Sequence, residues 1–148
     1  MITEEIMKEK TSADHLLYVS LKYTKTCDVI LNLIARWKSL IELCFDEMLR
    51  VAVKQKKIPR MPGNPKEKIE FMRTYFKKLP AVQEAIPLYI FFKRIPELPK
   101  RREGEFRKNV ALKIIEPGRE VDINMEKLKE YTDILERFIS EVKQFLSK

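Results

Sequence analysis

Residues 12–58 read SADHLLYVSLKYTKTCDVILNLIARWKSLIELCFDEMLRVAVKQKKI and contain neither glycine nor proline. Apolar side chains recur in them every three or four residues, at Leu16, Val19, Tyr23, Cys27, Ile30, Ile34, Trp37, Ile41, Cys44, Met48 and Val51. This spacing is the period of one helix face. A second apolar row, at Val29, Leu33, Leu40, Leu43 and Leu49, widens the stripe. A wide stripe is typical of a bundle helix that touches two neighbours, so the stretch predicts a helical bundle with Trp37 near its centre.

The start and the continuity of this helix are less firmly set by the pattern. Thr11-Ser12-Ala13-Asp14 has the form of a helix start, with Asp in place of the usual Glu. Residues 1–11 are therefore expected to form a flexible N-terminal arm. Thr24, Thr26 and Val29 are stiff at χ1 and mark the place where the helix would bend or break. The pattern allows either one long helix or two.

The next two helices follow a clear start signal. In Asn64-Pro65-Lys66-Glu67, Asn suits the N-cap, Pro the first helical position and Glu the closing of a capping box. This helix should stop near Leu79, because Pro80 disfavours helical geometry in the residue before it. Residues 81–95 predict a shorter helix, kinked or restarted at Pro87. A buried strand over Leu88–Phe92 is the alternative.

The last third of the chain predicts a hairpin and a helix. Glu116-Pro117-Gly118-Arg119 fits a type II turn, and Val and Ile are frequent on both sides of it. Asp122 or Asn124 would cap the final helix, over residues 125–146. The whole chain, 1–148, is thus expected to be a single helical domain. Its fold class is mainly α: an antiparallel bundle of four or five helices, with a small β-hairpin before the C-terminal helix.

Composition excludes several classes of site. Three glycines are too few for a glycine-rich phosphate loop, and one histidine with two cysteines excludes an ordinary zinc site. We therefore expect no metal and no cofactor. His15 is the only histidine and is expected to be solvated, so no catalytic residue is assigned and enzymatic activity is not expected. Cys27 and Cys44 lie in the helical pattern and predict buried thiols in a reduced, cytoplasmic protein.

Charge divides the chain more sharply than any repeat does. The net charge is +8, and residues 53–108 hold 16 basic and 6 acidic residues and seven of the eight prolines. The flanking thirds are each close to neutral. A basic segment of this kind favours polyanions. No secretory signal is visible, and the longest apolar run, Ile86–Phe92, is far below the ~20 residues of a membrane span, so no membrane partner is expected.

The sequence therefore predicts a non-enzymatic RNA-binding module, with RNA or another polyanion as partner. The candidate contacts are Lys93, Arg94, Lys100, Arg101, Arg102, Arg107 and Lys108, helped by Lys56, Lys57 and Arg60. Phe106 and other aromatics nearby are candidates for stacking on unpaired bases. For Tyr89, Phe91 and Phe92 a place in the core is the favoured interpretation.

A second function class stays open. In this alternative hypothesis, the long helices form a protein-interaction or homodimer interface without nucleic-acid binding. In that case Lys100, Arg101 and Arg102 would be matched by acids of the last helix such as Glu126, Glu130 and Asp133. In the RNA-binding case the same three cations would project from a loop with no acidic partner nearby.

Two stretches resemble known proteins. Leu17–Ile30, LYVSLKYTKTCDVI, looks like the opening of small, largely uncharacterised prokaryotic helical proteins, and Glu105–Leu112, EFRKNVAL, lies where those proteins carry a Glu-aromatic-Arg-basic-His stretch. With long helices around a basic segment, the chain resembles the HEPN superfamily of helical bundles. That resemblance implies dimerisation and, in active members, metal-independent RNA cleavage by an Arg followed by a His. Arg102 matches the Arg, but Asn109 stands at the His position and is no acid or base, so the resemblance implies binding rather than cleavage.

Overall fold

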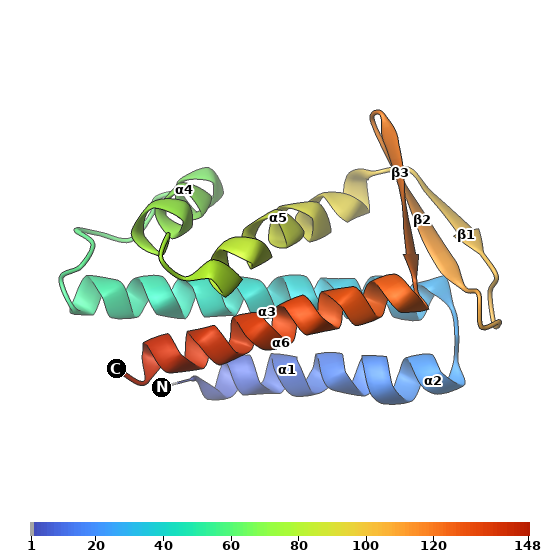
Figure 1. Cartoon of the computed structure of the whole chain (residues 1–148), viewed down its shortest axis with the longest axis horizontal. Coiled ribbons are helices and arrows are strands. Elements are labelled where there is room, and N and C mark those ends of the chain that lie inside the picture. The colour runs from blue at the N-terminus through green and yellow to red at the C-terminus, as the bar shows by residue number, and fades with distance from the viewer. Residues whose placement is uncertain (1) are drawn as a thin grey trace.

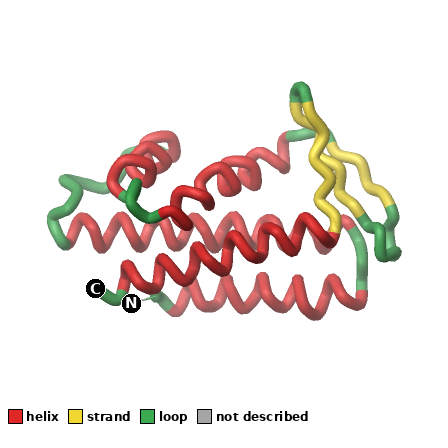
Figure 2. The backbone as a smooth tube through the Cα atoms, in the orientation of Figure 1, coloured by secondary structure: helices red, strands yellow, loops and turns green. Residues whose placement is uncertain are grey.

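The structure is a computed structural model and describes residues 2–148. It is mainly helical, with a small sheet before the last helix, as the sequence predicts (Figures 1 and 2). The helices are α1 (Glu4–His15), a π-helical turn (Leu16–Ser20), α2 (Leu21–Tyr23), α3 (Cys27–Lys54), α4 (Pro65–Tyr75), α5 (Pro80–Arg94), a 3₁₀ turn (Ile95–Glu97) and α6 (Met125–Leu146). The strands are β1 (Lys100–Glu103), β2 (Ala111–Glu116) and β3 (Arg119–Asn124). No helix in residues 2–148 is long and apolar enough to cross a membrane.

Helix α1 starts at Glu4, so the expected flexible arm over 1–11 is wrong for most of the described residues of that stretch, while Met1 lies outside the described residues. The Thr3 hydroxyl caps α1 by accepting a hydrogen bond from the Ile6 amide at 3.2 Å. Ile6 is buried in the core, which ties this first turn to the bundle. The start signal at Thr11 is therefore overridden by a cap eight residues earlier, because burial of Ile6 stabilises the longer helix.

Two helices, rather than one, cover residues 12–58. The chain leaves helical geometry at residues 24–26, where the threonines predicted the break. Thr26 then caps α3, its hydroxyl accepting from the Val29 amide at 3.3 Å. Because of the break, α1 and α3 lie side by side and run in opposite directions (Figure 1).

Helix α3 is the centre of the bundle and packs against α1, α5 and α6. Its apolar rows bury twelve side chains, among them Trp37, which is 3% exposed. The Trp37 ring stacks on Phe92 of α5 at 6.0 Å between centroids and meets Tyr131 of α6 edge-on at 6.3 Å. The predicted central position of Trp37 is confirmed.

Helices α4 and α5 form largely where the sequence predicts them. Asn64 caps α4 and accepts from the Glu67 amide at 2.8 Å, although the helix ends at Tyr75, before Leu79. Helix α5 runs without interruption through Pro87, so the strand alternative for Leu88–Phe92 is wrong. Tyr89 and Phe92 are buried and Phe91 is partly buried against the core.

The sheet has three antiparallel strands in the order β1-β2-β3, one more than the predicted hairpin. Gly118 in the β2–β3 turn has a φ of 82°, as a type II turn requires. Leu112, Ile114 and Ile123 are fully buried and fix the sheet to the helices. Asn124, at the end of β3, then caps α6 by accepting from the Lys127 amide at 2.8 Å.

The elements leave two distinct ends. Helices α1 and α5 run toward the sheet, and α3 and α6 run away from it (Figure 1). The sheet and the short link before α3 lie at one end, which we call the sheet end (Figure 2). The connection from α3 to α4 and the C-terminus of α6 lie at the other, which we call the loop end.

Replacing Trp37 with Ala should lower the free energy of unfolding by about 3–5 kcal/mol, because a buried ring between two aromatic neighbours leaves a cavity. Denaturant unfolding followed by circular dichroism measures this change. The parent protein should show tryptophan emission typical of an apolar environment. Emission at the wavelength of a water-exposed indole would contradict the placement.

Candidate nucleic-acid interface

The predicted basic residues do not form one surface. Lys56, Lys57 and Arg60 follow α3 at the loop end, whereas residues 93–108 lie at the sheet end. The 28 residues of α3 span about 42 Å between these ends. The structure therefore separates residues 54–60 from residues 93–108, and their help in binding stays a prediction.

Most of the cation triplet at the sheet end is already paired. Arg101 contacts Glu120 across the sheet at 2.5 Å, and Arg102 contacts Asp28 at 2.7 Å. The Lys100 ammonium donates instead to backbone carbonyl oxygens of residues 96 and 98. The expectation of a loop with no acidic partners is wrong, because these residues form strand β1.

The acids expected from the last helix are not the partners either. Glu126, Glu130 and Asp133 make none of these pairs; Glu130 pairs with Lys127 on its own helix. The carboxylates that do pair come from β3, from the first turn of α3 and, with Glu105 at 3.6 Å from Arg102, from the β1–β2 connection. The hydrogen bond from Arg102 lowers the pKa of the Asp28 carboxyl. Arg101 and Arg102 therefore join elements of the fold.

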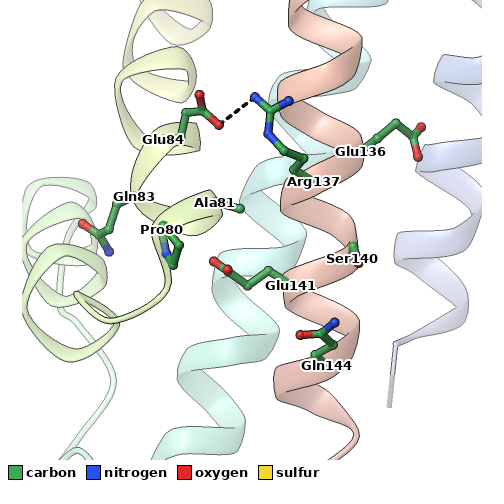
Figure 3. A pocket seen from close by; sticks show the side chains of 9 residues that line it. All are labelled: Pro80, Ala81, Gln83, Glu84, Glu136, Arg137, Ser140, Glu141 and Gln144. Atoms are coloured by element: carbon green, nitrogen blue, oxygen red, sulfur yellow. Dashed lines mark hydrogen bonds and ion pairs between the residues drawn. The ribbon is translucent and has the colours of Figure 1, made fainter.

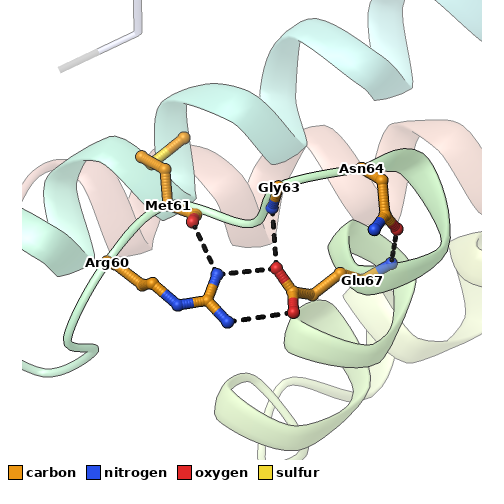
Figure 4. Close-up of polar contacts among 5 residues, drawn as sticks. All are labelled: Arg60, Met61, Gly63, Asn64 and Glu67. Atoms are coloured by element: carbon orange, nitrogen blue, oxygen red, sulfur yellow. Dashed lines mark hydrogen bonds and ion pairs between the residues drawn. The ribbon is translucent and has the colours of Figure 1, made fainter.

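Arg60 holds the α3–α4 loop together (Figure 4). Its guanidinium donates to both oxygens of Glu67, at 2.6 and 3.0 Å, and to the Met61 carbonyl at 3.1 Å. Glu67 also accepts from the Gly63 amide at 2.7 Å. This amide is one residue before the position that a capping box would use. The arrangement makes Arg60 a clamp of the loop, not a free cation for phosphate.

The β1–β2 connection carries an unusual aromatic residue. Phe106 is 75% exposed and has a φ of 66°, in the left-handed region that bulky side chains avoid. Backbone hydrogen bonds fix it there: its amide donates to the Lys25 carbonyl at 2.6 Å, and the Arg107 amide donates to the Gly104 carbonyl at 2.9 Å. Glu105 adds a third tie by accepting from the Cys27 amide at 3.2 Å.

A second exposed ring stands beside this connection. Tyr23, at the end of α2, is 78% exposed and lies two residues before Lys25. The apolar stripe predicted from the sequence included Tyr23 and Val19, but both side chains are exposed, so that prediction is wrong for these two residues. They lie near the end of the first helical stretch, on a side that is not buried against another element. Lys22 lies 5.8 Å from the centre of the Tyr23 ring.

Four cations lie within two residues of the two rings in the sequence. None of the ion pairs found within residues 2–148 includes Lys22, Lys25, Arg107 or Lys108. We name this group the aromatic tip: Lys22, Tyr23, Lys25, Phe106, Arg107 and Lys108. The sequence pointed to Phe106, Arg107 and Lys108, whereas Lys22, Tyr23 and Lys25 belong to the tip only through the fold. Lys93 and Arg94 lie exposed in the last turn of α5.

A shallow groove between α5 and α6 is lined by engaged groups (Figure 3). Glu141 of α6 accepts a hydrogen bond from the Val82 amide at 2.9 Å and so caps the first turn of α5. The N-cap residue of α5 itself, Leu79, makes no side-chain capping hydrogen bond. Arg137 pairs with Glu84 at 3.0 Å. These two contacts join the two helices to each other, while Gln83 ties α5 to α4 and Glu136 ties α6 to Lys10 of α1.

The remaining reactive side chains do not assemble into a site. His15 is exposed in the last turn of α1. Cys27 and Cys44 are buried free thiols, and burial raises their pKa values to about 11 and about 12. Within residues 2–148, no three His, Cys, Asp or Glu side chains are grouped as a metal site requires.

The two residues that the HEPN resemblance singles out both lie on the β1–β2 hairpin. Arg102 is in β1, and Asn109 is exposed just before β2. The resemblance stays a prediction. Comparisons with family models, with curated proteins and with solved structures each find no match for this chain.

Glu67 gives the loop clamp a clear pH dependence. The hydrogen bonds from Arg60 and from the Gly63 amide lower its pKa to about 2, from 4.5. A lowered pKa in the folded state means that the contribution to stability is complete above the unfolded pKa and is lost as pH falls toward 2. Glu67→Gln should therefore lower the melting temperature at pH 7, and the difference from the parent should shrink in acid. A difference that stays constant from pH 7 to pH 2 would contradict the assignment.

Proposed function

We propose that the aromatic tip binds single-stranded nucleic acid, with RNA as the expected ligand. Bases stack on Phe106 and Tyr23, while Lys22, Lys25, Arg107 and Lys108 contact the flanking phosphates. Aromatic faces beside cations are the common device of proteins that bind single strands. The observation that carries the proposal is the exposed Phe106 in left-handed backbone geometry.

Stability does not account for this phenylalanine. Left-handed geometry costs a residue with a side chain on the order of 1–3 kcal/mol. A ring that is 75% exposed recovers little of that cost through burial. Glycine or asparagine would suit the same backbone better. The ring is thus held in water, at a cost, where an unpaired base can reach its face.

The cations of the tip support the same ligand. The tip cations have no carboxylate to leave when they contact a phosphate, although Lys25 donates to the Lys22 carbonyl at 2.8 Å, whereas Arg101 and Arg102 would first have to leave Glu120 and Asp28. Double-stranded nucleic acid offers phosphates but keeps its base faces stacked inside. The combination of free cations with free rings therefore favours a single strand over a duplex.

Phe106→Asn should weaken binding of a fluorescein-labelled oligouridylate about 5- to 150-fold, the equivalent of the roughly 1–3 kcal/mol that one stacked base contributes. The melting temperature should stay the same or rise, because asparagine adopts the left-handed region more easily. Fluorescence anisotropy and a thermal melt measure the two effects. Tyr75→Asn, which removes a partly exposed ring at the loop end, is the matched control and should bind like the parent.

Salt provides an independent test of the phosphate contacts. Four contacts to a single strand predict a slope of about −2.8 for the logarithm of affinity against the logarithm of salt concentration. Lys22→Gln combined with Lys25→Gln should reduce that slope by about 1.4. Lys8→Gln combined with Lys129→Gln removes two exposed cations elsewhere and should leave it unchanged.

Three outcomes would overturn the proposal. One is an oligouridylate affinity that Phe106→Asn does not change. Another is a preference for duplex over single strand. The third is a stable dimer that is indifferent to any oligonucleotide, which would favour the homodimer alternative. A matched deoxyribose oligonucleotide tells RNA from DNA as the ligand.

A further inference from the structure

A cavity of about 240 Å³ lies at the loop end, far from the aromatic tip. It opens where the C-terminal ends of three helices meet, and its lining includes Ala52 of α3, Thr74 of α4 and Phe145 of α6. These residues are far apart in the sequence. The cavity is therefore a product of the fold, with no counterpart in any local motif.

The floor of the cavity is apolar. Ala52, Ile58 and Phe76 are buried, and the Phe76 ring meets Phe145 edge-on at 5.2 Å between centroids. Its volume is slightly below the roughly 300–1,000 Å³ of sites for drug-sized ligands. The space suits an aromatic group of one or two fused rings or a short hydrocarbon chain.

The rim carries only positive charge. Lys57, Lys77 and Lys78 line the cavity, and no carboxylate does. None of the three is in an ion pair within the described part of the chain. The Lys57 ammonium lies 5.6 Å from the centre of the Phe145 ring, which holds it over the apolar floor.

The charge around the cavity is larger than the helices themselves require. Residues 53–78 hold nine basic and two acidic residues, so most of the positive excess of the middle segment lies here and not in 93–108. The C-terminus of a helix attracts cations with the equivalent of about half a negative charge. Three such ends offset only about one and a half of these charges. Glu67 pairs with Arg60 and Asp46 with Lys68, and the three lysines of the cavity lie outside the ion pairs found among residues 2–148.

We infer that this cavity binds a small organic anion, whose apolar ring or chain enters the pocket while its phosphate or carboxylate meets Lys57, Lys77 and Lys78. The apolar floor favours the hydrocarbon part, and the rim attracts the charge at the mouth. An inorganic anion would contact the lysine rim but not the apolar floor. A neutral apolar molecule would contact the floor but gain nothing from the lysines.

Isothermal titration calorimetry with 1-naphthyl phosphate tests the inference on the full chain. This probe should bind at least tenfold more tightly than 1-naphthol, which lacks the charge, and than inorganic phosphate, which lacks the ring. 1-Naphthoate separates a carboxylate ligand from a phosphate ligand. Equal affinity for 1-naphthol and 1-naphthyl phosphate, or no binding of any of the probes, would overturn the inference.

Two variants locate the binding. Lys77→Gln combined with Lys78→Gln should weaken 1-naphthyl phosphate binding at least tenfold. Lys8→Gln combined with Lys129→Gln is the control with two exposed lysines outside the cavity. Thr74→Trp should fill the mouth and abolish binding, whereas Arg73→Trp, at the neighbouring exposed position of α4, should not. All of these substitutions are at exposed positions, so each variant should have a melting temperature close to that of the parent, which a thermal melt checks.

The result is separable from the proposed RNA binding. Phe106→Asn should leave the affinity for 1-naphthyl phosphate unchanged, because the tip and the cavity lie at opposite ends of the bundle. If the double lysine variant instead weakens oligouridylate binding while the parent fails to bind 1-naphthyl phosphate, the lysine rim serves the nucleic acid and the inference of a small-molecule site is wrong.

Discussion

The burial of α3 on three sides is the constraint that organises this molecule. Its twelve buried side chains require apolar partners from α1, α5 and α6 at once. The interior among residues 2–148 accordingly holds no buried charged residue, and the partly buried Glu42 is satisfied by the Tyr89 hydroxyl at 2.6 Å. Charged side chains therefore lie on the outer surfaces and at the two ends of the bundle. Both candidate binding sites, the aromatic tip and the cavity, lie at these ends.

The two ends manage their charge by different physical means. At the sheet end, the three strands bring cations and carboxylates onto one surface, so that Arg101 of β1 reaches Glu120 of β3 across β2, and Lys113 of β2 meets its register partner Asp122. At the loop end, three helices finish with carbonyl groups that favour lysines without supplying a full negative charge. The first arrangement pairs Arg101 and Arg102 of β1, and the second leaves Lys57, Lys77 and Lys78 outside the ion pairs found among residues 2–148. This difference explains why residues 100–102, the most obvious run of cations in the sequence, carry less unpaired positive charge than the rim of the cavity at the loop end.

Helix boundaries were predictable where one local signal had no competitor. Asn64 and Asn124 cap α4 and α6 as expected, because each side chain reaches an amide three residues on. The start of α1 was mispredicted because a cap at Thr3 combines with the burial of Ile6, and burial depends on helices distant in the sequence. Strand β1 was missed because its residues are nearly all charged and show no alternation. It pairs through its backbone with β2, a contact that no local pattern records.

The candidate sites were only partly readable for the same reason. Phe106, Arg107 and Lys108 are neighbours in the sequence, whereas Tyr23 joins them because the Phe106 amide reaches the Lys25 carbonyl. That bond, with those at Glu105 and Gly104, determines the backbone at position 106 whatever its side chain is. Left-handed geometry is thus a property of the hairpin, and the fold alone would be served best by glycine or asparagine there. A phenylalanine that the fold does not need, exposed to water in the same tip as a second ring and four cations, is the reason for proposing a partner outside the chain.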